Sequence, residues 1–463
     1  MTLILVGVII AMALASFALT SRAETVESFF SGRSAEGRAP GVLALTLSQV
    51  TTWIFARSIM NAAILGYFYG IAGALAYTAY YLSFLTGAAI IDSLRFRHGF
   101  TNVQSFLADR FGIAGPIAFN FVSGVRLLSE VFANLLVIGA IFGAAGSMAY
   151  AAAVLAVGAV TLLYAGVGGL HASIRTDVLQ MVVFLAVLAI FLVMSVAGGG
   201  FDIGGVLASS PAIENPGWVL LAVALLQVWS YPMHDPVMMD RGLIADRATT
   251  RRSFMHAAWL SMACILAFGL IGTYAGIAKL PDETLITTLE RLFGMTPVLL
   301  FNIALLISCM STLDSTLASA SKLVVVDAGA AAATPFNGRL AMAAFMIGGV
   351  LLVFVGSKDL FSAVAVSGTA SMFLAPVVFF SLWLGWRDVP VWSFIVSFAV
   401  AMGGATLYFL EASGYSTTMN AVTGLEHKYA KLLAICLVVM IVNCGSFIVG
   451  RALSTSGASR GAV

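Results

Sequence analysis

One long apolar stretch of the chain carries a cluster of oxygen-bearing side chains. Ser308, Ser311, Thr312 and Ser315 are spaced by three and four residues and therefore share one face of a helix. Asp314 flanks that face, because it lies about 100° from Ser315 around the helix axis. Such hydroxyls can also bond to their own helix or hold helices together. Hydroxyl and carbonyl oxygens are hard ligands, so four hydroxyls beside an aspartate predict a site for a hard cation such as Na⁺.

Two other apolar stretches are interrupted by polar residues and prolines. Five of the eight residues in 46–53 are polar, and the segment 230–236 contains Pro232 and Pro236 beside His234. Each proline removes an amide donor and clashes with the preceding helical turn. Broken backbone survives in a membrane only where protein or water satisfies it. We therefore predict a broken helix at both segments, each next to a polar cavity.

The composition determines which solvent surrounds these elements. The chain has 463 residues, of which 60% are hydrophobic and 10% charged, against roughly 25% charged in soluble domains. This excludes a soluble enzyme, a disordered protein and a nucleic-acid binder with a basic face. The apolar runs are continuous rather than alternating, so they predict helices and not a barrel. The predicted fold class is an all-α membrane protein, with lipid as its solvent.

Counting apolar runs of spanning length, about 20 residues, predicts thirteen transmembrane helices. The first run lacks a basic residue before it, so we interpret it as a helix and not as a signal peptide. The runs fall at 2–20, 42–69, 71–94, 114–142, 148–169, 173–197, 217–241, 252–278, 297–327, 338–356, 360–385, 391–411 and 430–450.

The two predicted breaks lie in the second and seventh spans, five spans apart. Residues 42–197 and 217–385 would then be two five-helix halves of opposite orientation, because five is odd. This arrangement is typical of inverted-repeat secondary transporters, whose site lies at the breaks. Residues 1–20 add an N-terminal helix and 391–450 add two C-terminal helices, so 1–463 is one transmembrane domain.

Successive loops lie on opposite sides of the membrane, and most Lys and Arg residues, Arg241 among them, fall in every second loop and therefore on one side. The positive-inside rule then predicts an N-terminus outside and a cytoplasmic C-terminus, in a plasma or inner membrane. The expected partners are the lipid bilayer and a small-molecule solute. We expect no nucleic acid, obligatory protein partner or organic cofactor.

Three stretches resemble the sodium/solute symporter family, which includes sodium-coupled proline, pantothenate, sialic acid and glucose carriers. The first is Phe29-Phe30-Ser31-Gly32-Arg33-Ser34, followed by Leu47-Ser48-Gln49-Val50-Thr51-Thr52-Trp53. The second is Gly168-Gly169-Leu170-His171-Ala172, followed by Thr176-Asp177-Val178-Leu179-Gln180. The third is Met310-Ser311-Thr312-Leu313-Asp314-Ser315, followed by Ala320-Ser321-Lys322 and Asp327.

The resemblance implies a five-plus-five inverted repeat with a sodium site between its first and eighth core helices. By motif position the ligands are the backbone carbonyls of Leu47, Val50 and Ser308 and the hydroxyls of Ser311 and Thr312. Leu47 and Val50 offer only backbone oxygen, so we expect the helix to be unwound there, which frees carbonyls.

The resemblance also assigns Asp177 either to the inner sodium path or to a second sodium site with Asp314 and Ser315. Asp314 departs from the serine that is more usual in the family. A carboxylate there either strengthens a second cation site or carries a proton, and the sequence leaves both open.

Charged residues at membrane depth have two interpretations. In one, Arg126 pairs with Glu130 at i, i+4 and Arg57 extends outward to the membrane surface. In the other, an arginine receives a substrate carboxylate, and Arg57 with Glu130 forms an outer gate. Some acid-transporting relatives use an arginine on the fourth span, which favours Arg126. The substrate-binding candidates are Gln49, Thr51, Trp53, Arg126, Tyr231, His234 and Asp235.

The predicted function is sodium-coupled symport of a small organic solute that carries a carboxylate, such as an amino acid or organic acid, by alternating access. One alternative is proton coupling through Asp177, Asp314 or His234, and another is a membrane sensor that does not transport. An enzyme is not expected, because the sequence shows neither a nucleophile–base pair nor a metal motif.

Overall fold

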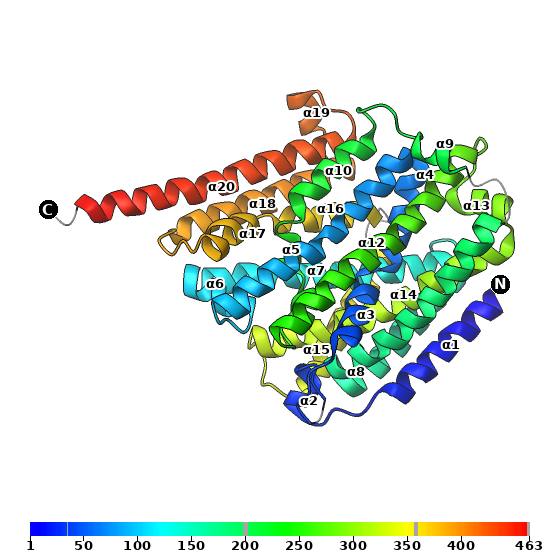
Figure 1. Cartoon of the computed structure of the whole chain (residues 1–463), viewed down its shortest axis with the longest axis horizontal. Helices are drawn as coiled ribbons and strands as arrows, with labels where there is room; N and C mark the ends of the chain where they lie inside the picture. Colours follow the sequence, from blue (N-terminus) through cyan, green and yellow to red (C-terminus); the bar gives the residue numbers. More distant parts are fainter. Residues whose placement is uncertain (35, 198–201, 356–359, 461–463) are drawn as a thin grey trace.

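The computed structural model describes residues 1–34, 36–197, 202–355 and 360–460, and these residues form helices joined by short loops (Figure 1). The helices of the first part are α1 (Thr2–Leu19), α2 (Val26–Phe30), α3 (Val42–Trp53), α4 (Ala56–Ala79), η1 (Tyr80–Leu82), α5 (Ser83–Ile91), η2 (Asp92–Arg97), α6 (Val103–Phe111), α7 (Ala114–Phe142) and α8 (Met148–Ala197). Those of the second part are α9 (Ile203–Leu207), α10 (Pro216–Gln227), η3 (Tyr231–His234), α11 (Pro236–Gly242), α12 (Arg247–Ala278), α13 (Leu285–Phe293), α14 (Met295–Lys322), η4 (Leu323–Asp327), α15 (Pro335–Val355), α16 (Leu360–Ser371), α17 (Leu374–Pro376), η5 (Val377–Trp383), α18 (Val391–Ala412), α19 (Thr418–Thr423) and α20 (Lys428–Arg460).

Many of these helices are apolar enough to cross a bilayer. Among the described residues, nine helices meet the length and hydropathy of a membrane span, and the pair Ala365–Ser371 and Leu374–Trp383, bent by 46°, raises the number to ten. The chain is therefore an all-helical integral membrane protein, as its composition predicted.

Two of the long helices contain a sharp turn at a glycine. Gly70 in α4 has φ 66° and ψ −151°, and Gly169 in α8 has φ 59° and ψ −151°. A Cβ at Gly73 would lie 2.1 Å from the carbonyl oxygen of Leu65, although residues eight apart are about 12 Å apart in a straight helix. The chain therefore reverses at Gly70, at the boundary between two predicted spans. The total of thirteen stays a prediction.

The predicted break in the seventh span is confirmed. α10 ends at Gln227, and α11 begins only at Pro236, after the short η3. Asp235 accepts a hydrogen bond from the backbone N–H of Met238 (3.2 Å) and so caps α11. Pro236 occupies the first helical position, where its missing N–H costs nothing.

The break in the second span lies elsewhere than predicted. α3 is helical through Trp53, and the interruption is at Ile54 and Phe55, before α4. The prediction placed the break within 46–53. The polar side chains of that segment are all buried in the protein, so the helix accommodates them without a break. Side chains satisfy the backbone groups that flank the break at Ile54 and Phe55, as a membrane interior requires. Tyr81 donates to the Trp53 carbonyl (2.7 Å), and the Ala56 N–H donates to Asn134 (3.2 Å).

Elements distant in sequence pack side by side. α12 packs along α4, α14 along α8, and α18 along α20, while α1 lies on the outside against α8 and α14 (Figure 1). α3 lies between α12, α8 and α14. The polar residues of α3 and α14 therefore meet inside the protein.

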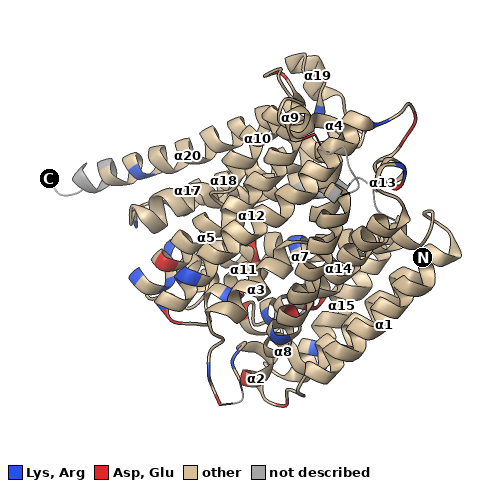
Figure 2. Cartoon of the chain, turned by 45° about the vertical axis from the view of Figure 1, so that its right-hand side comes forward, with Lys and Arg blue, Asp and Glu red and all other residues tan. Residues whose placement is uncertain are grey.

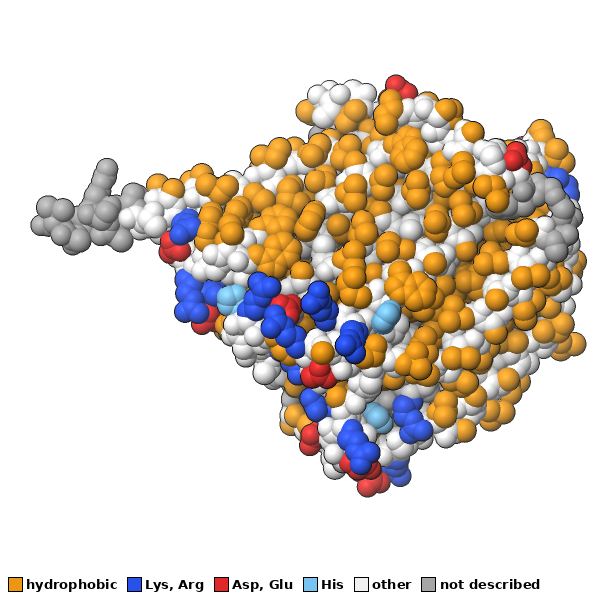
Figure 3. Space-filling model, viewed as in Figure 1, with side chains coloured by type: hydrophobic (Ala, Val, Ile, Leu, Met, Phe, Trp, Pro, Cys, Tyr) orange, Lys and Arg blue, Asp and Glu red, His pale blue; other side chains and the backbone are white. Residues whose placement is uncertain are grey.

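Charged residues gather toward the helix ends, and a few lie in the interior near α7, α11 and α14 (Figure 2). On the face drawn in Figure 3, most Lys and Arg form a band at one end of an otherwise apolar surface. Arg97, Arg247, Arg251 and Arg252 are exposed, and Arg97 and Arg247 both pair with Asp92. This separation agrees with an integral membrane protein. The orientation of the termini stays a prediction.

Candidate cation site and polar cavity

The hydroxyl cluster of α14 is fully buried and faces α3 and α8. Ser311 donates to Oδ1 of Asp177 (2.9 Å), and Thr312 donates to the carbonyl of Ser308 (2.9 Å). The hydroxyl of Ser308 donates to the carbonyl of Ile54, in the break between α3 and α4. The predicted cluster thus lies at the broken helix, and its oxygens keep lone pairs for a cation.

The backbone ligands predicted on α3 are less available than expected. Leu47 and Val50 are buried inside the helix, and the Val50 carbonyl accepts a hydrogen bond from the N–H of Ile54 (2.9 Å). The expectation that this segment is unwound was wrong, because the helix continues to Trp53. A carbonyl oxygen has a second lone pair, so an intrahelical hydrogen bond does not prevent it from coordinating a cation.

Asp177 is the centre of the buried network. Its carboxylate accepts hydrogen bonds from Ser48 (2.6 Å), Ser311 (2.9 Å), Ser315 (3.1 Å to the nearer oxygen) and Arg241 (2.9 Å). These four donors lie on α3, α14 and α11. Asp177 therefore connects both broken helices to α14.

Asp314 lies beside this centre with its own set of donors. Ser173 and Thr176 of α8 each donate to it at 2.9 Å, and Ser315 donates at 3.2 Å. The predicted grouping of Asp177, Asp314 and Ser315 is therefore present in space. All three side chains are completely buried.

Arg241 was missed, because the charge pattern assigned it to a cytoplasmic loop. It lies on α11 with an exposure of 0%, and its guanidinium donates to Ser48 (2.7 Å), Ser315 (2.7 Å) and Asp177. It also donates to the carbonyl of Val237 one turn earlier (3.1 Å). Its place five residues after Pro236, on the short helix that follows the break, was the signal that could have found it.

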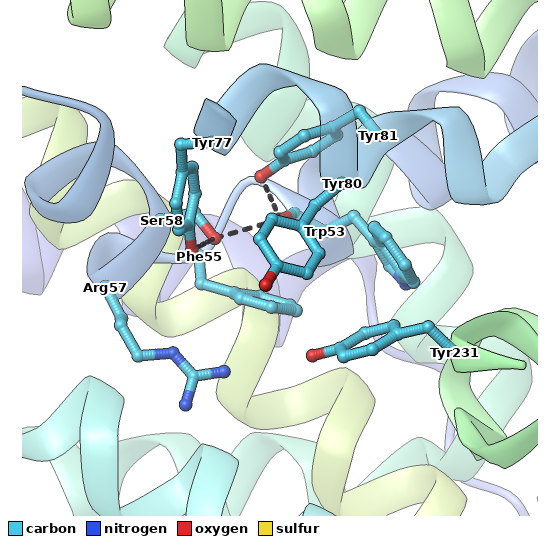
Figure 4. Close-up of a pocket in the computed structure, with 8 residues that line it drawn as sticks. All are labelled: Trp53, Phe55, Arg57, Ser58, Tyr77, Tyr80, Tyr81 and Tyr231. Carbon is cyan, nitrogen blue, oxygen red and sulfur yellow. Dashed lines mark hydrogen bonds between the residues drawn. The ribbon is translucent and has the colours of Figure 1, made fainter. Parts of the chain in front are cut away.

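A small cavity lies where the two broken helices approach each other (Figure 4). Its volume is about 20 Å³, room for one water molecule. Ser58, Arg57 and six aromatic residues line it: Trp53, Phe55, Tyr77, Tyr80, Tyr81 and Tyr231. The rings of Trp53 and Tyr231 are 5.7 Å apart, and those of Tyr80 and Tyr231 are 6.0 Å apart.

Beside the cavity two arginines face two acids. Arg126 Nη2 lies 2.6 Å from Asp235 and 2.9 Å from Glu130, whereas Arg57 Nη2 lies 3.9 Å from Glu130. All four side chains are about 1% exposed. The predicted pairs of Glu130 with Arg126 and with Arg57 are both present. The outward extension of Arg57 was wrong, because its guanidinium is buried against the ring of Phe55.

The remaining substrate candidates differ in how they are bonded. His234 is bonded to the carbonyl of Tyr231 (2.6 Å) and to Ser367 (3.1 Å). Gln49 is buried, and neither of its amide atoms has a hydrogen-bond partner among the described residues. Trp53 Nε1 also lacks a partner in the described part of the chain. Thr51 is buried in α3, and Tyr231 lines the cavity.

The sequence matches no family model, but curated relatives and solved structures are similar to it. A sodium-dependent multivitamin transporter of Oryctolagus cuniculus is 30% identical over 260 residues, which is 51% of this chain and 40% of the relative. The chain thus matches less than half the length of that relative. A Na⁺-coupled sialic acid symporter, solved in a substrate-bound outward-open state, superposes with a TM-score of 0.73 at 14% identity, over 98% of this chain and 97% of that one.

These matches confirm the resemblance to the sodium/solute symporter family. A nucleobase-cation-symport-1 family transporter in a closed conformation shares the fold more distantly, with a TM-score of 0.56 at 15% identity over 90% of this chain and 94% of that one. All three proteins are transporters and not enzymes, in agreement with the sequence.

Proposed function

We propose that this chain is a sodium-coupled secondary symporter of a small organic solute that carries a carboxylate, working by alternating access. The observation that carries the proposal is the chain of contacts around α14: Ser308 donates to Ile54 in the break between α3 and α4, Thr312 donates to Ser308, and Ser311 donates to Asp177. Hard oxygen donors on two helices suit Na⁺. The sodium-dependent relative and the Na⁺-coupled structural neighbour support the same ion.

Coupling follows from where the ion and the solute would bind. Na⁺ between α3 and α14 would hold these helices together, and the solute would bind beside the same α3, at Trp53. Each ligand then lowers the free energy of the conformation that the other prefers, and the effect is reciprocal. Separation of α3 from α14 would release both ligands inward.

The first experiment is the thermal stability of the purified protein with a solute panel, in sodium and in potassium. The panel contains amino acids, short carboxylates, sialic acid, pantothenate and sugars. Stabilisation by a carboxylate only in sodium is the expected result. Stabilisation by a solute regardless of sodium would contradict sodium coupling, and no response to sodium or any solute would contradict the symporter function.

A second coupling site is proposed at Asp177, Asp314 and Ser315. The guanidinium of Arg241 donates to Asp177 and to Ser173 and Ser315, and these two serines donate to Asp314. One further positive charge would therefore balance the second buried carboxyl group. That charge is a second Na⁺ or a proton. Uptake into proteoliposomes driven by a pH gradient without sodium would favour the proton.

We also propose the topology that the sequence predicts. Residues 42–197 and 217–385 would form the inverted repeats, with the N-terminus outside and the C-terminus in the cytoplasm of a cell with a plasma or inner membrane. Labelling of single cysteines with an impermeant reagent, at Asp282 and at Arg251 in turn, tests it. Labelling of the Asp282→Cys variant in intact cells and of the Arg251→Cys variant only after lysis is expected.

A further inference from the structure

Several polar atoms around the cavity lack a hydrogen-bond partner among the residues that the structure describes. In the described part of the chain, buried nitrogens without a hydrogen-bond partner occur on five neighbouring residues: Gln49, Trp53, Arg57, Asn61 and Arg126. Gln49 lies one helical turn before Trp53, and Asn61 lies one turn after Arg57, so they extend the same faces. Buried polar groups are normally bonded, which makes this concentration a signal for a ligand.

The unsatisfied atoms are mainly donors. Arg57 and Arg126 each leave Nε and Nη1 without a hydrogen bond to a described residue, and the indole of Trp53 adds another. The unsatisfied acceptor at the same place is the amide oxygen of Gln49, because Oε1 of Glu130 lies 2.9 Å from Nη2 of Arg126. A ligand that satisfies this site must bring acceptors. Each hydroxyl of a sugar brings a donor together with its acceptor lone pairs, whereas a carboxylate brings acceptors only.

The two arginines are not equivalent. Arg126 is held by Asp235 and Glu130 at hydrogen-bonding distance, and its guanidinium lies 5.0 Å from the centre of the Tyr231 ring. Arg57 lines the cavity and makes no hydrogen bond to a described residue, and its ion pair with Glu130 is long at 3.9 Å. Arg57 is therefore the cation whose present partner is most readily replaced.

The residues that line the cavity indicate the chemical nature of the uncharged part of the ligand. Phe55 lies under Arg57, with the guanidinium carbon 5.4 Å from the ring centre, and Figure 4 shows both beside Trp53 and Tyr231. Trp53 stands edge-on to Tyr231, with a 5.7 Å separation and an interplanar angle of 80°. Aromatic walls of this kind favour a flat unsaturated body through stacked and edge contacts.

We propose that Arg57 is the carboxylate receptor of this site and that the solute is an aromatic or other planar carboxylate, whose ring replaces the contacts between Trp53, Phe55 and Tyr231. This rests on the proposed symport function and deepens it. Because the cavity of about 20 Å³ is too small for such a solute, binding separates these rings. The carboxylate takes the place of Glu130 at Arg57.

The test measures how simple probes stabilise the purified full-length protein in sodium. Benzoate carries both the charge and the ring, cyclohexanecarboxylate carries the charge alone, and benzamide carries the ring without the charge. Benzoate is expected to bind at least about tenfold more tightly than either of the other two. Equal binding of benzoate and cyclohexanecarboxylate would overturn the planar class, and preference for glucose would overturn the carboxylate class.

Matched lysine variants assign the receptor. Arg57→Lys keeps the charge and loses the planar fork, so benzoate affinity should fall about tenfold while stabilisation by sodium alone persists. Arg339→Lys is the control, because Arg339 binds backbone carbonyls of Gly166 and Ala23 away from the cavity. A loss that follows Arg126→Lys and not Arg57→Lys would overturn the assignment.

A second variant covers the case in which Arg57→Lys does not fold. Glu130→Gln removes the acid that competes for Arg57, so benzoate should bind more tightly, and unchanged or weaker binding would overturn the proposal. Failure of the proposed function itself looks different. The wild-type protein would then show no stabilisation by sodium at all.

Discussion

The guanidinium Nη2 of Arg241 lies 2.9 Å from Oδ2 of Asp177, and both side chains are completely buried. Arg241 is on α11 and Asp177 is on α8, which belong to the two predicted halves of the protein. The same guanidinium also donates to Ser48 of α3 and Ser315 of α14. One buried ion pair thus joins four helices around the proposed cation sites.

Breaking this pair should destabilise the protein strongly. Arg241→Gln leaves the carboxylate of Asp177 buried without its cation, which costs about 3–5 kcal/mol. The double variant Arg241→Gln/Asp177→Asn should recover part of that loss. Unfolding in potassium measures both effects without bound sodium.

The matched control for this prediction is Arg451→Gln. Arg451 pairs with Asp388 at 3.0 Å, but both side chains are more than a third exposed, so the effect should be at most about 1 kcal/mol. Equal effects of Arg241→Gln and Arg451→Gln on the free energy of unfolding would show that the buried pair contributes no more to stability than the exposed one.

Removing the hydroxyls of Ser311 and Thr312 should weaken sodium dependence before it weakens folding. The double alanine variant loses two proposed ligands, so the sodium concentration for half-maximal stabilisation should rise at least about tenfold. Ser319→Ala is the control, because its hydroxyl is buried in the same helix without a described partner. Unchanged sodium activation in the double variant would contradict the first site.

The turn in α4 depends on the absence of a side chain at Gly70. Its φ of 66° is in the left-handed region, and a Cβ there would lie 2.4 Å from the hydroxyl oxygen of Ser210. Gly70→Ala should therefore lower stability by about 2 kcal/mol or more. Gly403→Ala, in a helix with open space around the site, should change stability by less than about 1 kcal/mol. Thermal unfolding of the two variants would be compared, and similar destabilisation by both would contradict the explanation.

The loop between α12 and α13 should lose stability in acid. Hydrogen bonds from Arg291 lower the pKa of Glu283 to about 2, below the value of about 4.3 in an unfolded chain. The carboxylate therefore stabilises the folded protein above about pH 4, and this contribution is lost as the pH falls toward 2. Glu283→Gln should flatten the dependence of melting temperature on pH in this window.

The control for the acid prediction is Glu290→Gln. Glu290 lies on α13, and its replacement also removes one negative charge, but it breaks no ion pair among the described residues. Its pH profile should keep the wild-type slope. Identical slopes for the wild-type protein and Glu283→Gln would argue against the contribution of this pair.

The sequence alone determined that the protein lies in a bilayer and that one of its helices carries a polar face. Continuous apolar runs require a bilayer, and the spacing of Ser308, Ser311, Thr312 and Ser315 sets one polar face whatever packs against it. The two prolines around His234 likewise determined the second break. These features depend on local periodicity and on the missing N–H of proline, which neighbouring elements do not change.

The tertiary structure decided which partner each polar residue meets. Arg241 has the sequence context of a loop arginine, yet it is buried because Asp177, 64 residues earlier, neutralises it. The position of the first break also depended on remote groups, since Tyr81 and Asn134 satisfy the backbone around Ile54 and Phe55. A charge or a freed carbonyl can be buried only when its counterpart arrives from another helix, and sequence periodicity does not contain that information.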